Sequence, residues 1–276
     1  MPGQRLHSKP MPSHAPAGRL LRHYRQARGL SQLSLSGMAD VSTRHISYVE
    51  NGKAKPSREM LLTLSAALEL PLRERNTLLV SAGFAPVYGE TPLEAPEMAH
   101  VRAAAQCILD SLEPNGAVLL GGQWQVLQVN AGAMRMLTTF CPDATNLPEL
   151  GTSLMRLLFD PKGLKPCIAN WDEVVRHIVH RLQRDAAAES ERGVARRALA
   201  DVLTYPGVPH ALRQPMLSTP PELVIPVHLR RGDLEIRLFT TLTTLGTPLD
   251  ITTEEIRIES YFPADEASRR WVHADA

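Results

Sequence analysis

Residues 31–52, SQLSLSGMADVSTRHISYVENG, decide the fold of the N-terminal part of the chain. Ser31 and Ser42 each precede a short segment of helical periodicity, where a serine hydroxyl accepts a hydrogen bond from the first turn of a helix. Apolar residues at i and i+3 spacing predict one buried stripe on each helix, Leu35 with Met38 and Ile46 with Val49. The stretch therefore predicts two short helices packed against each other.

A sharp turn has to join these helices, because only Ala39, Asp40 and Val41 separate the two periodic segments. Aspartate is one of the few non-glycine residues that tolerates the left-handed backbone conformation. Gly52 follows the second segment, at the position where glycine commonly ends a helix. Residues 31–52 thus predict a helix, a turn and a helix in close succession.

This pattern resembles the helix-turn-helix of the Cro/repressor (XRE) family. The matching residues are Leu30, Gln32, Leu35, Ala39, Val41, Ser42, Ile46, Ser47, Glu50 and Gly52, followed by Pro56 and Ser57. Asp40 departs from the family pattern, which usually has glycine there. The resemblance implies a DNA-binding domain, and the alternative is an ordinary pair of packed helices.

Polar residues of the second helix are the candidate DNA contacts, because a recognition helix reaches base edges through its N-terminal residues. Arg44 is the best candidate for bidentate recognition of guanine; a phosphate contact or a solvated side chain is the alternative. Gln32 opens the first helix and would position the protein on a phosphate without reading sequence. The complete candidate set is Gln32, Ser42, Thr43, Arg44, His45, Ser47, Tyr48 and Lys53.

Length and charge indicate two domains of different character. The chain has 276 residues, 43% of them hydrophobic. Residues 1–90 contain 12 Lys and Arg against 6 Asp and Glu, a net charge of +6, whereas the rest contain 18 against 23, a net charge of −5. This distribution fits DNA binding at one end only. Because no apolar run approaches the ~20 residues of a membrane span and no signal-peptide pattern occurs, we expect a cytoplasmic protein without a membrane partner.

Composition and periodicity divide the chain into four segments. We expect a disordered tail at 1–16, a five-helix XRE-type DNA-binding domain at 17–83, a semi-extended linker at 84–96 and a second domain at 97–276. Arginines recur every third residue in the first helix, which predicts a solvated basic face or phosphate contacts. They are Arg19, Arg22, Arg25 and Arg28.

The second domain is expected to be α+β. Strand patterns at 117–120 and 124–129 are joined by Gly121 and Gly122, which is typical of a hairpin. Helical patterns follow after Asn130 and at 150–159, 171–188 and 192–203, and alternating segments then occur at 223–229, 234–242 and 256–262. The hairpin and the later three-strand meander can share one five-stranded antiparallel sheet, with the helices gathered on one face.

That order of elements resembles a PAS-like sensor domain, and the sequence resembles more closely the ligand-binding domain of MmyB-like transcription regulators. The matching segments are Trp124–Asn130, Arg156–Pro161, Asn170–Trp171, Arg230–Gly232, Thr243–Pro248 and Arg257–Asp265. The resemblance implies a regulator whose C-terminal domain holds a small apolar ligand, with fatty acids as one class.

Flexible and aliphatic side chains of the predicted strands and helices are the candidate ligand contacts, since ligand pockets are mostly apolar and methionine suits irregular cavities. They are Met134, Leu137, Met155, Leu158, Val175, Ile178, Leu238 and Leu242. A fully packed core without a cavity, in which the domain serves only for dimerisation, is the alternative.

The sequence contains two groups of residues of metal-ligating types. Cys107, Cys141 and Cys167 lack CxxC spacing, so we expect buried thiols rather than a zinc site or a disulfide frame. Glu173, His177 and His180 share one side of a predicted helix whose apolar residues lie on the other side, which predicts a solvent-exposed stripe.

No catalytic motif of the GxSxG, HExxH or phosphate-loop type occurs, so we expect neither an enzyme nor a cofactor. The sequence therefore predicts a homodimeric, ligand-responsive transcriptional regulator that binds a double-stranded DNA operator. Dimerisation is expected because one recognition helix reads only a few base pairs. The alternative is a helix-turn-helix interaction or scaffold protein without sequence-specific DNA binding.

Overall fold

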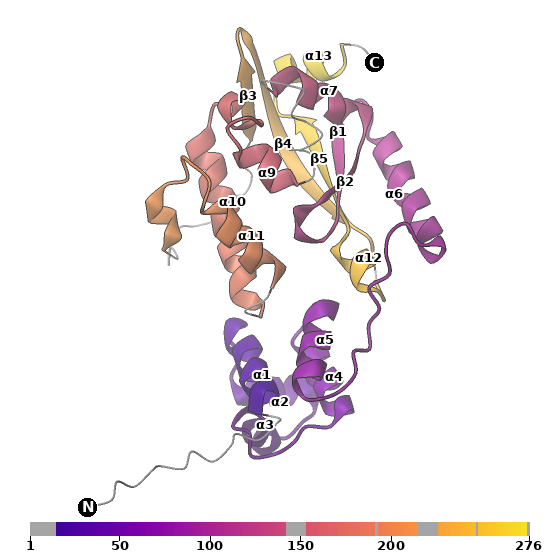
Figure 1. Cartoon of the computed structure of the whole chain (residues 1–276), viewed down its shortest axis with the longest axis vertical. Helices are drawn as coiled ribbons and strands as arrows, with labels where there is room; N and C mark the ends of the chain where they lie inside the picture. Colours follow the sequence, from indigo (N-terminus) through magenta and orange to yellow (C-terminus); the bar gives the residue numbers. More distant parts are fainter. Residues whose placement is uncertain (1–14, 142–152, 191–192, 215–225, 247, 275–276) are drawn as a thin grey trace, which may run out of the picture. The chain divides into compact units, whose positions relative to one another are not determined.

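The computed structural model describes residues 15–141, 153–190, 193–214, 226–246 and 248–274. The chain divides into two units, Met1–Gly89 and Glu90–Ala276 (Figure 1). Most of the tail predicted at 1–16 lies outside the described residues. Residues 15 and 16, however, already belong to the first helix, so this end of the predicted tail was wrong.

Helices build the first unit between residues 15 and 89. They are α1 (Ala15–Ala27), α2 (Gln32–Ala39), α3 (Thr43–Glu50), α4 (Arg58–Ala67) and α5 (Leu72–Ser81). The predicted serine caps are confirmed, because Ser31 and Ser42 accept hydrogen bonds from the backbone N–H groups of Ser34 and His45. Asp40 has the predicted left-handed backbone, with φ 51° and ψ 40°, and so turns the chain from α2 into α3.

The core of the first unit joins all five helices. Leu35, Ile46 and Val49 are buried as predicted, but Met38 is 56% exposed. Ala39 is buried in its place, because the inner stripe of α2 has i, i+4 spacing rather than i, i+3. The remaining large core residues come from the other helices: Leu21, Tyr24, Leu61, Leu64, Leu68, Leu70, Leu78 and Leu79.

The predicted basic face of α1 is only partly present. Arg19 and Arg22 are exposed and Arg28 is half-buried. Arg25 is buried instead and forms an ion pair with Glu50 of α3. The arginine repeat of three residues drifts around a helix of 3.6 residues per turn, which carries Arg25 to the inner side.

A five-stranded antiparallel sheet forms the centre of the second unit in the described residues, as predicted. Its order is β2-β1-β5-β4-β3, so a hairpin and a meander are joined by pairing of β1 with β5. The strands are β1 (Gly116–Leu120), β2 (Val126–Val129), β3 (Val227–Arg231), β4 (Leu234–Thr244) and β5 (Arg257–Pro263). Trp124 was predicted in a strand but lies in a 3-10 turn, Gly122–Trp124, with a left-handed φ of 61°.

Helices cover both faces of this sheet, so the prediction that they gather on one face was wrong (Figure 1). Alternate residues of β1 mark the two faces: Val118 and Leu120 belong to the larger core, whereas Ala117 and Leu119 pack with α6. The helices are α6 (Ala99–Ser111), α7 (Ala131–Phe140), α9 (Leu154–Phe159), α10 (Trp171–Ala188), α11 (Val194–Val202), α12 (Ile251–Glu255) and α13 (Glu266–Val272).

Several helix and strand boundaries in the structure differ from the predicted ones. The helix predicted at 150–159 begins at Leu154 in the structure, and residues 150–152 lie outside the described part, as do residues 223–225 of a predicted strand. Cys141 and Cys167 are buried thiols as predicted, but Cys107 on α6 is exposed. Helix α12, between β4 and β5, was not predicted because its five residues are too few to show a helical period.

Candidate DNA-binding surface and ligand pocket

Helix α3 presents one apolar and one polar face. Ile46 and Val49 are buried in the core of the first unit, which directs the opposite side of the helix to solvent. Arg44, His45 and Tyr48 are exposed on that side. The helix thus holds polar side chains close to its N-terminal end, where recognition helices contact base edges.

Arg44 and Tyr48 form a pair on this exposed face. The Nε of Arg44 donates a hydrogen bond to the Tyr48 hydroxyl at 3.2 Å. The Arg44 guanidinium carbon also lies 5.3 Å from the centre of the Tyr48 ring. Since residues at i and i+4 are neighbours on a helix, the ring limits the directions that the guanidinium can take.

The other predicted DNA contacts belong to α3 or lie close to its ends. Thr43 and Ser47 are half-buried, Ser42 caps the helix, and Ser47 Oγ lies 3.3 Å from the side-chain nitrogen of Asn51. Lys53 follows in the next loop with an exposed side chain. These residues lie on α3 or close to its ends, outside its buried apolar stripe.

Gln32 is less available than the sequence suggested. Its side-chain nitrogen donates to Oε2 of Glu50 at 2.8 Å, and the residue is half-buried. Glu50 also accepts two hydrogen bonds from Arg25, and the pKa of Arg25 is raised mainly by the hydrogen bond to this carboxylate. One of the two amide hydrogens of Gln32 therefore fixes the start of α2 to the end of α3.

A cavity lies in the second unit between α9, α10, the 3-10 turn and β5. Its volume is about 40 Å³. The apolar lining consists of Trp124, Leu154, Met155, Leu158, Ile178 and Leu182, and the polar lining consists of Arg181 and Glu259. This combination of an apolar wall with a few polar groups is typical of small-molecule sites.

Two cationic side chains lie close to the ring of Trp124 at this cavity. The guanidinium carbons of Arg181 and Arg257 lie 4.6 and 5.3 Å from its ring centre. Both distances allow cation–π attraction, which is stronger where water is excluded. Burial lowers the pKa of Arg181, and the nearby Glu259 carboxylate offsets part of this effect.

Burial raises the pKa of Glu259 to about 6, against an ordinary value of 4.5. The positive charge of Arg181, a hydrogen bond with Tyr261 and the charge of Arg257 act in the opposite direction. The pKa of the Tyr261 phenol is raised by its own burial and by the Glu259 charge. The polar end of the cavity therefore contains a carboxyl group that titrates close to neutral pH.

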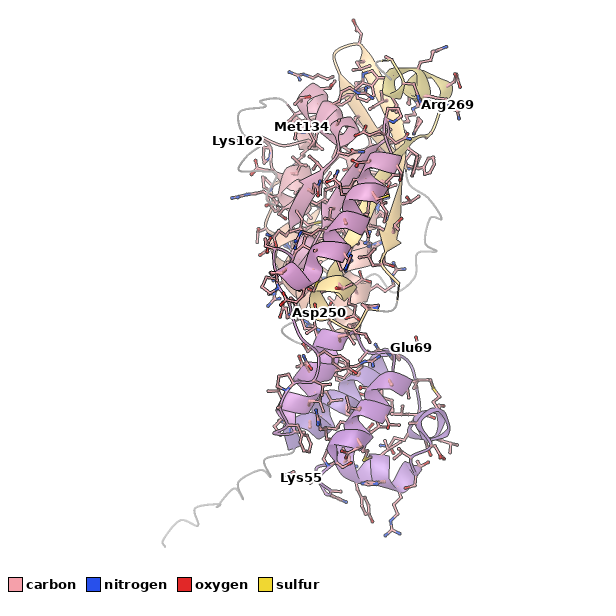
Figure 2. The ribbon with its side chains drawn as sticks, turned by 90° about the vertical axis from the view of Figure 1, so that its right-hand side faces the viewer. Lys55, Glu69, Met134, Lys162, Asp250 and Arg269 are labelled. Atoms are coloured by element: carbon pink, nitrogen blue, oxygen red, sulfur yellow. The ribbon has the colours of Figure 1, made fainter. Side chains whose placement is uncertain are left out.

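The predicted pocket residues fall into three groups. Met155, Leu158 and Ile178 line the cavity. Met134 and Leu242 were expected on inner faces, but they are 44% and 41% exposed, and Met134 lies on the outer side of α7 (Figure 2). Met134 points outward because the buried side of α7 is formed by its neighbours Ala133, Met136, Leu137 and Phe140. The third group, Leu137, Val175 and Leu238, is buried in the core.

Three residues of the cavity lining, Trp124, Arg181 and Glu259, were not predicted, and neither was Arg257 beside the Trp124 ring. Spacing alone could not identify them, because they come from a turn, a helix and a strand that meet only in the folded unit. A signal was nevertheless present, since Trp124, Arg257 and Glu259 lie in segments that carry the resemblance to MmyB-like regulators.

The residue types that bind metal ions do not gather at one place in the described part of the chain. Within the described residues, no group of three or more His, Cys, Asp or Glu side chains is placed to hold a metal ion. Glu173 and His177 are exposed on α10 and His180 is half-buried, so most of the predicted stripe faces solvent. None of the helices in the described ranges is long and apolar enough to cross a membrane.

Comparison with known families identifies both units. Residues 101–274 match the model of the MmyB-like transcription regulator ligand binding domain, which covers more than half of the chain. The chain belongs to the MmyB-like transcription regulators. Residues 21–75 of this MmyB-like regulator match a helix-turn-helix family model. The two matches place a helix-turn-helix segment and a regulator ligand-binding domain in one chain.

Individual relatives are similar to part of this MmyB-like regulator only. The transcriptional regulator ClgR of two Mycobacterium tuberculosis strains, CDC 1551 / Oshkosh and H37Rv, is 36% identical over 66 residues, which are 24% of this chain and 56% of the relative. The chain thus spans about half the length of these curated relatives. Two crystal structures of the clp gene regulator ClgR from Corynebacterium glutamicum are each 25% identical to this chain, with a TM-score of 0.24. The first match covers 29% of this chain and 100% of the ClgR chain, and the second covers 38% and 95%.

Proposed function

We propose that this MmyB-like regulator reads a specific DNA operator through α3 and responds to a small apolar ligand in its second unit. The observation that supports base recognition is the exposed Arg44 at the start of α3. Tyr48 engages only its Nε, and among the described residues Nη1 and Nη2 make no hydrogen bond. These two donors match the O6 and N7 acceptors of a guanine in the major groove.

Contacts with the DNA backbone would position α3. Lys53 has an exposed ammonium group in the loop after the helix. Gln32 retains one amide hydrogen, beside the first N–H groups of α2, which have no partner within their own helix. Such phosphate contacts fix the protein on the duplex and carry no sequence information.

The regulator would act as a homodimer in the cytoplasm. One recognition helix contacts few base pairs, and dimeric helix-turn-helix proteins bind two half-sites about 34 Å apart. A fragment of residues 1–90 should then bind the operator much more weakly than the full chain, as measured by fluorescence anisotropy at equal salt. Equal affinities would contradict a dimer whose contacts lie beyond residue 90.

A fatty acid or a similar small apolar molecule is the ligand class that the pocket supports. Its apolar walls suit a hydrocarbon chain, and Arg181 and Arg257 supply positive charge for an anionic end group. The cavity of about 40 Å³ is far smaller than the ~300–1,000 Å³ of typical ligand pockets. Flexible lining residues such as Met155 would therefore have to move when a ligand enters.

Selection of bound sites from random double-stranded DNA tests the operator proposal. We expect one recurrent, inverted-repeat sequence, bound with much higher affinity than random DNA and with a steep dependence on salt. Binding of all sequences alike would leave the helix-turn-helix as a non-specific or protein-binding module.

Native mass spectrometry of the purified protein, followed by melting curves with fatty acids of medium and long chain, tests the ligand proposal. A ligand that binds only the folded state stabilises it by about 2.7 kcal/mol at a hundredfold excess over its dissociation constant. No bound molecule and no melting shift at any chain length would leave the second unit as a dimerisation module.

A further inference from the structure

The segment that joins the two units is fixed to each of them by an amide or carboxylate side chain. On the N-terminal side, Asn76 of α5 accepts hydrogen bonds from the backbone nitrogens of Val87 and Tyr88 at 2.9 and 3.1 Å. The Asn76 side-chain nitrogen donates to the Tyr88 carbonyl oxygen at 2.8 Å. Asn76 thus satisfies three backbone groups of a segment that the sequence predicts as an ordinary linker.

Asp250 forms the second anchor. Its Oδ2 accepts from the backbone nitrogen and the hydroxyl of Thr91 at 3.0 and 2.8 Å. Its Oδ1 accepts from the backbone nitrogen of Thr252 at 2.9 Å and so caps α12 (Figure 2). One carboxylate therefore holds both the start of the second unit and the start of α12.

Helix α12 leads directly to the pocket. Its last residue, Glu255, has its carboxylate against Gly122 of the turn that carries Trp124. Arg257 follows in the chain and lies over the Trp124 ring. Glu259, two residues further on, lines the cavity. A ligand that displaces Trp124 or β5 would therefore act on α12 through direct contacts.

The first anchor is connected to the recognition helix in the same way. Glu74, two residues before Asn76 on α5, accepts a hydrogen bond from the hydroxyl of Tyr24 on α1. The neighbouring Arg25 forms the buried ion pair with Glu50 at the end of α3. Two side-chain contacts, linked through the backbones of α5 and α1, thus connect the N-terminal anchor to α3.

Only Gly89 and Glu90 separate the two anchored segments, and the boundary between the units falls between them. Three residue steps join Tyr88 to Thr91 and span at most about 11 Å, so only a short piece of chain can absorb a movement of Thr91. We propose that Asn76 and Asp250 couple the pocket to the recognition helix, so that a change at Trp124 and β5 alters DNA binding. This coupling rests on the proposed function, because it needs a pocket whose occupancy changes.

The coupling is testable in the full chain without knowing the ligand. Ile178→Phe enlarges a side chain that lines the cavity, so the larger ring takes the place of a ligand. If that variant does not fold, Leu158→Phe fills the cavity from α9 instead. Affinity for the selected operator is measured in the wild-type, Asp250→Asn and Asn76→Ala backgrounds. Asp265→Asn, the same change at the cap of α13, is the matched control.

We expect the filled cavity to change operator affinity by at least about fivefold in the wild-type and Asp265→Asn backgrounds, the lower end of ordinary allosteric coupling. Asp250→Asn and Asn76→Ala should abolish most of this change while preserving the affinity of the unfilled protein. Hydrogen exchange at the Thr91 amide should respond to cavity filling in the wild type. An equal response in all backgrounds, or no response in the wild type, would overturn the coupling.

A parallel measurement separates this proposal from the ligand itself. Decanoate binding is followed by the fluorescence change of the tryptophans in the same variants. If decanoate and longer fatty acids fail to bind while cavity filling still acts through Asp250, the ligand class is wrong and the coupling stands. If they bind equally to all variants but change operator affinity equally with and without Asp250, the coupling is wrong and the ligand stands.

Discussion

Arg25 and Glu50 form a two-bond ion pair inside the first unit. Nε and Nη2 of Arg25 donate to Oε1 and Oε2 of Glu50 at 2.6 and 2.8 Å, and both side chains are buried. Nη1 of Arg25 donates to the carbonyl oxygen of Leu30 at 2.7 Å, and Gln32 completes the environment of Glu50. The pair therefore joins α1, the start of α2 and the end of α3 at one point.

Removal of one partner should destabilise the first unit strongly. Glu50→Ala leaves the Arg25 charge buried and unpaired, and we expect a loss of about 3–5 kcal/mol in the free energy of unfolding. Hydrogen exchange of the α1 and α3 amides in the full chain measures it. Glu235→Ala breaks an exposed pair with Arg237 and should cost less than about 1 kcal/mol. Similar losses in both variants would contradict this role of the buried pair.

Base recognition should depend on Arg44 and backbone contact on Lys53. Arg44→Ala should weaken binding to the selected operator by about 1–3 kcal/mol and relax the preference at one base pair. Lys53→Ala should weaken binding to all sequences alike and reduce the salt slope by about 1. Competition binding with operator variants at several salt concentrations separates the two effects. Unchanged sequence preference in Arg44→Ala would exclude this residue as the base reader.

Tyr48 should contribute to specificity by orienting Arg44. Tyr48→Phe keeps the ring beneath the guanidinium but removes the hydroxyl that accepts from Nε. We expect a reduced preference at the same base pair that Arg44→Ala affects, with little change in binding to random DNA. Tyr88→Phe removes a similar hydroxyl–arginine contact next to α5 and should leave specificity unchanged. Equal effects of the two variants would show that Tyr48 does not orient the arginine.

Glu259 should make the stability of the second unit depend on pH. Because its pKa is raised from 4.5 to about 6, the folded state holds the proton more tightly than the unfolded state does. Unfolding free energy should therefore fall as pH rises from about 4 to 7, by about 2 kcal/mol for this group. Glu259→Gln removes the carboxyl group and should remove this decrease, as measured by urea unfolding followed through tryptophan fluorescence.

Asp265 provides a control of opposite sign. Hydrogen bonds from Ser268 lower the pKa of this carboxyl group, so it stabilises the folded state above the unfolded pKa and loses that effect as pH falls. Asp265→Asn should thus destabilise the protein near neutral pH more than in acid.

If wild type and Glu259→Gln had parallel pH profiles, the proposed burial of the Glu259 charge would be wrong.

The local sequence determined the helix-turn-helix and the strand pattern. Ser31, Ser42 and Asp40 act within a few residues of their own positions, through caps and backbone conformation, so their roles follow from the sequence alone. The same holds for α10, whose predicted bounds match the structure. Alternation of apolar residues also predicted the strands, because side-chain direction in a strand repeats every second residue.

Only the tertiary structure decided which distant residues meet. The partners Arg25 and Glu50, Thr91 and Asp250, and the pocket group around Trp124 lie far apart in the chain, and no local period relates them. Local periodicity also failed for Met38 and Met134, because a shift of one position on a short helix turns a side chain by about 100°. Packing against the neighbouring elements fixes that rotation, so the inner face, the buried charges and the pocket emerge only when the helices and the sheet come together.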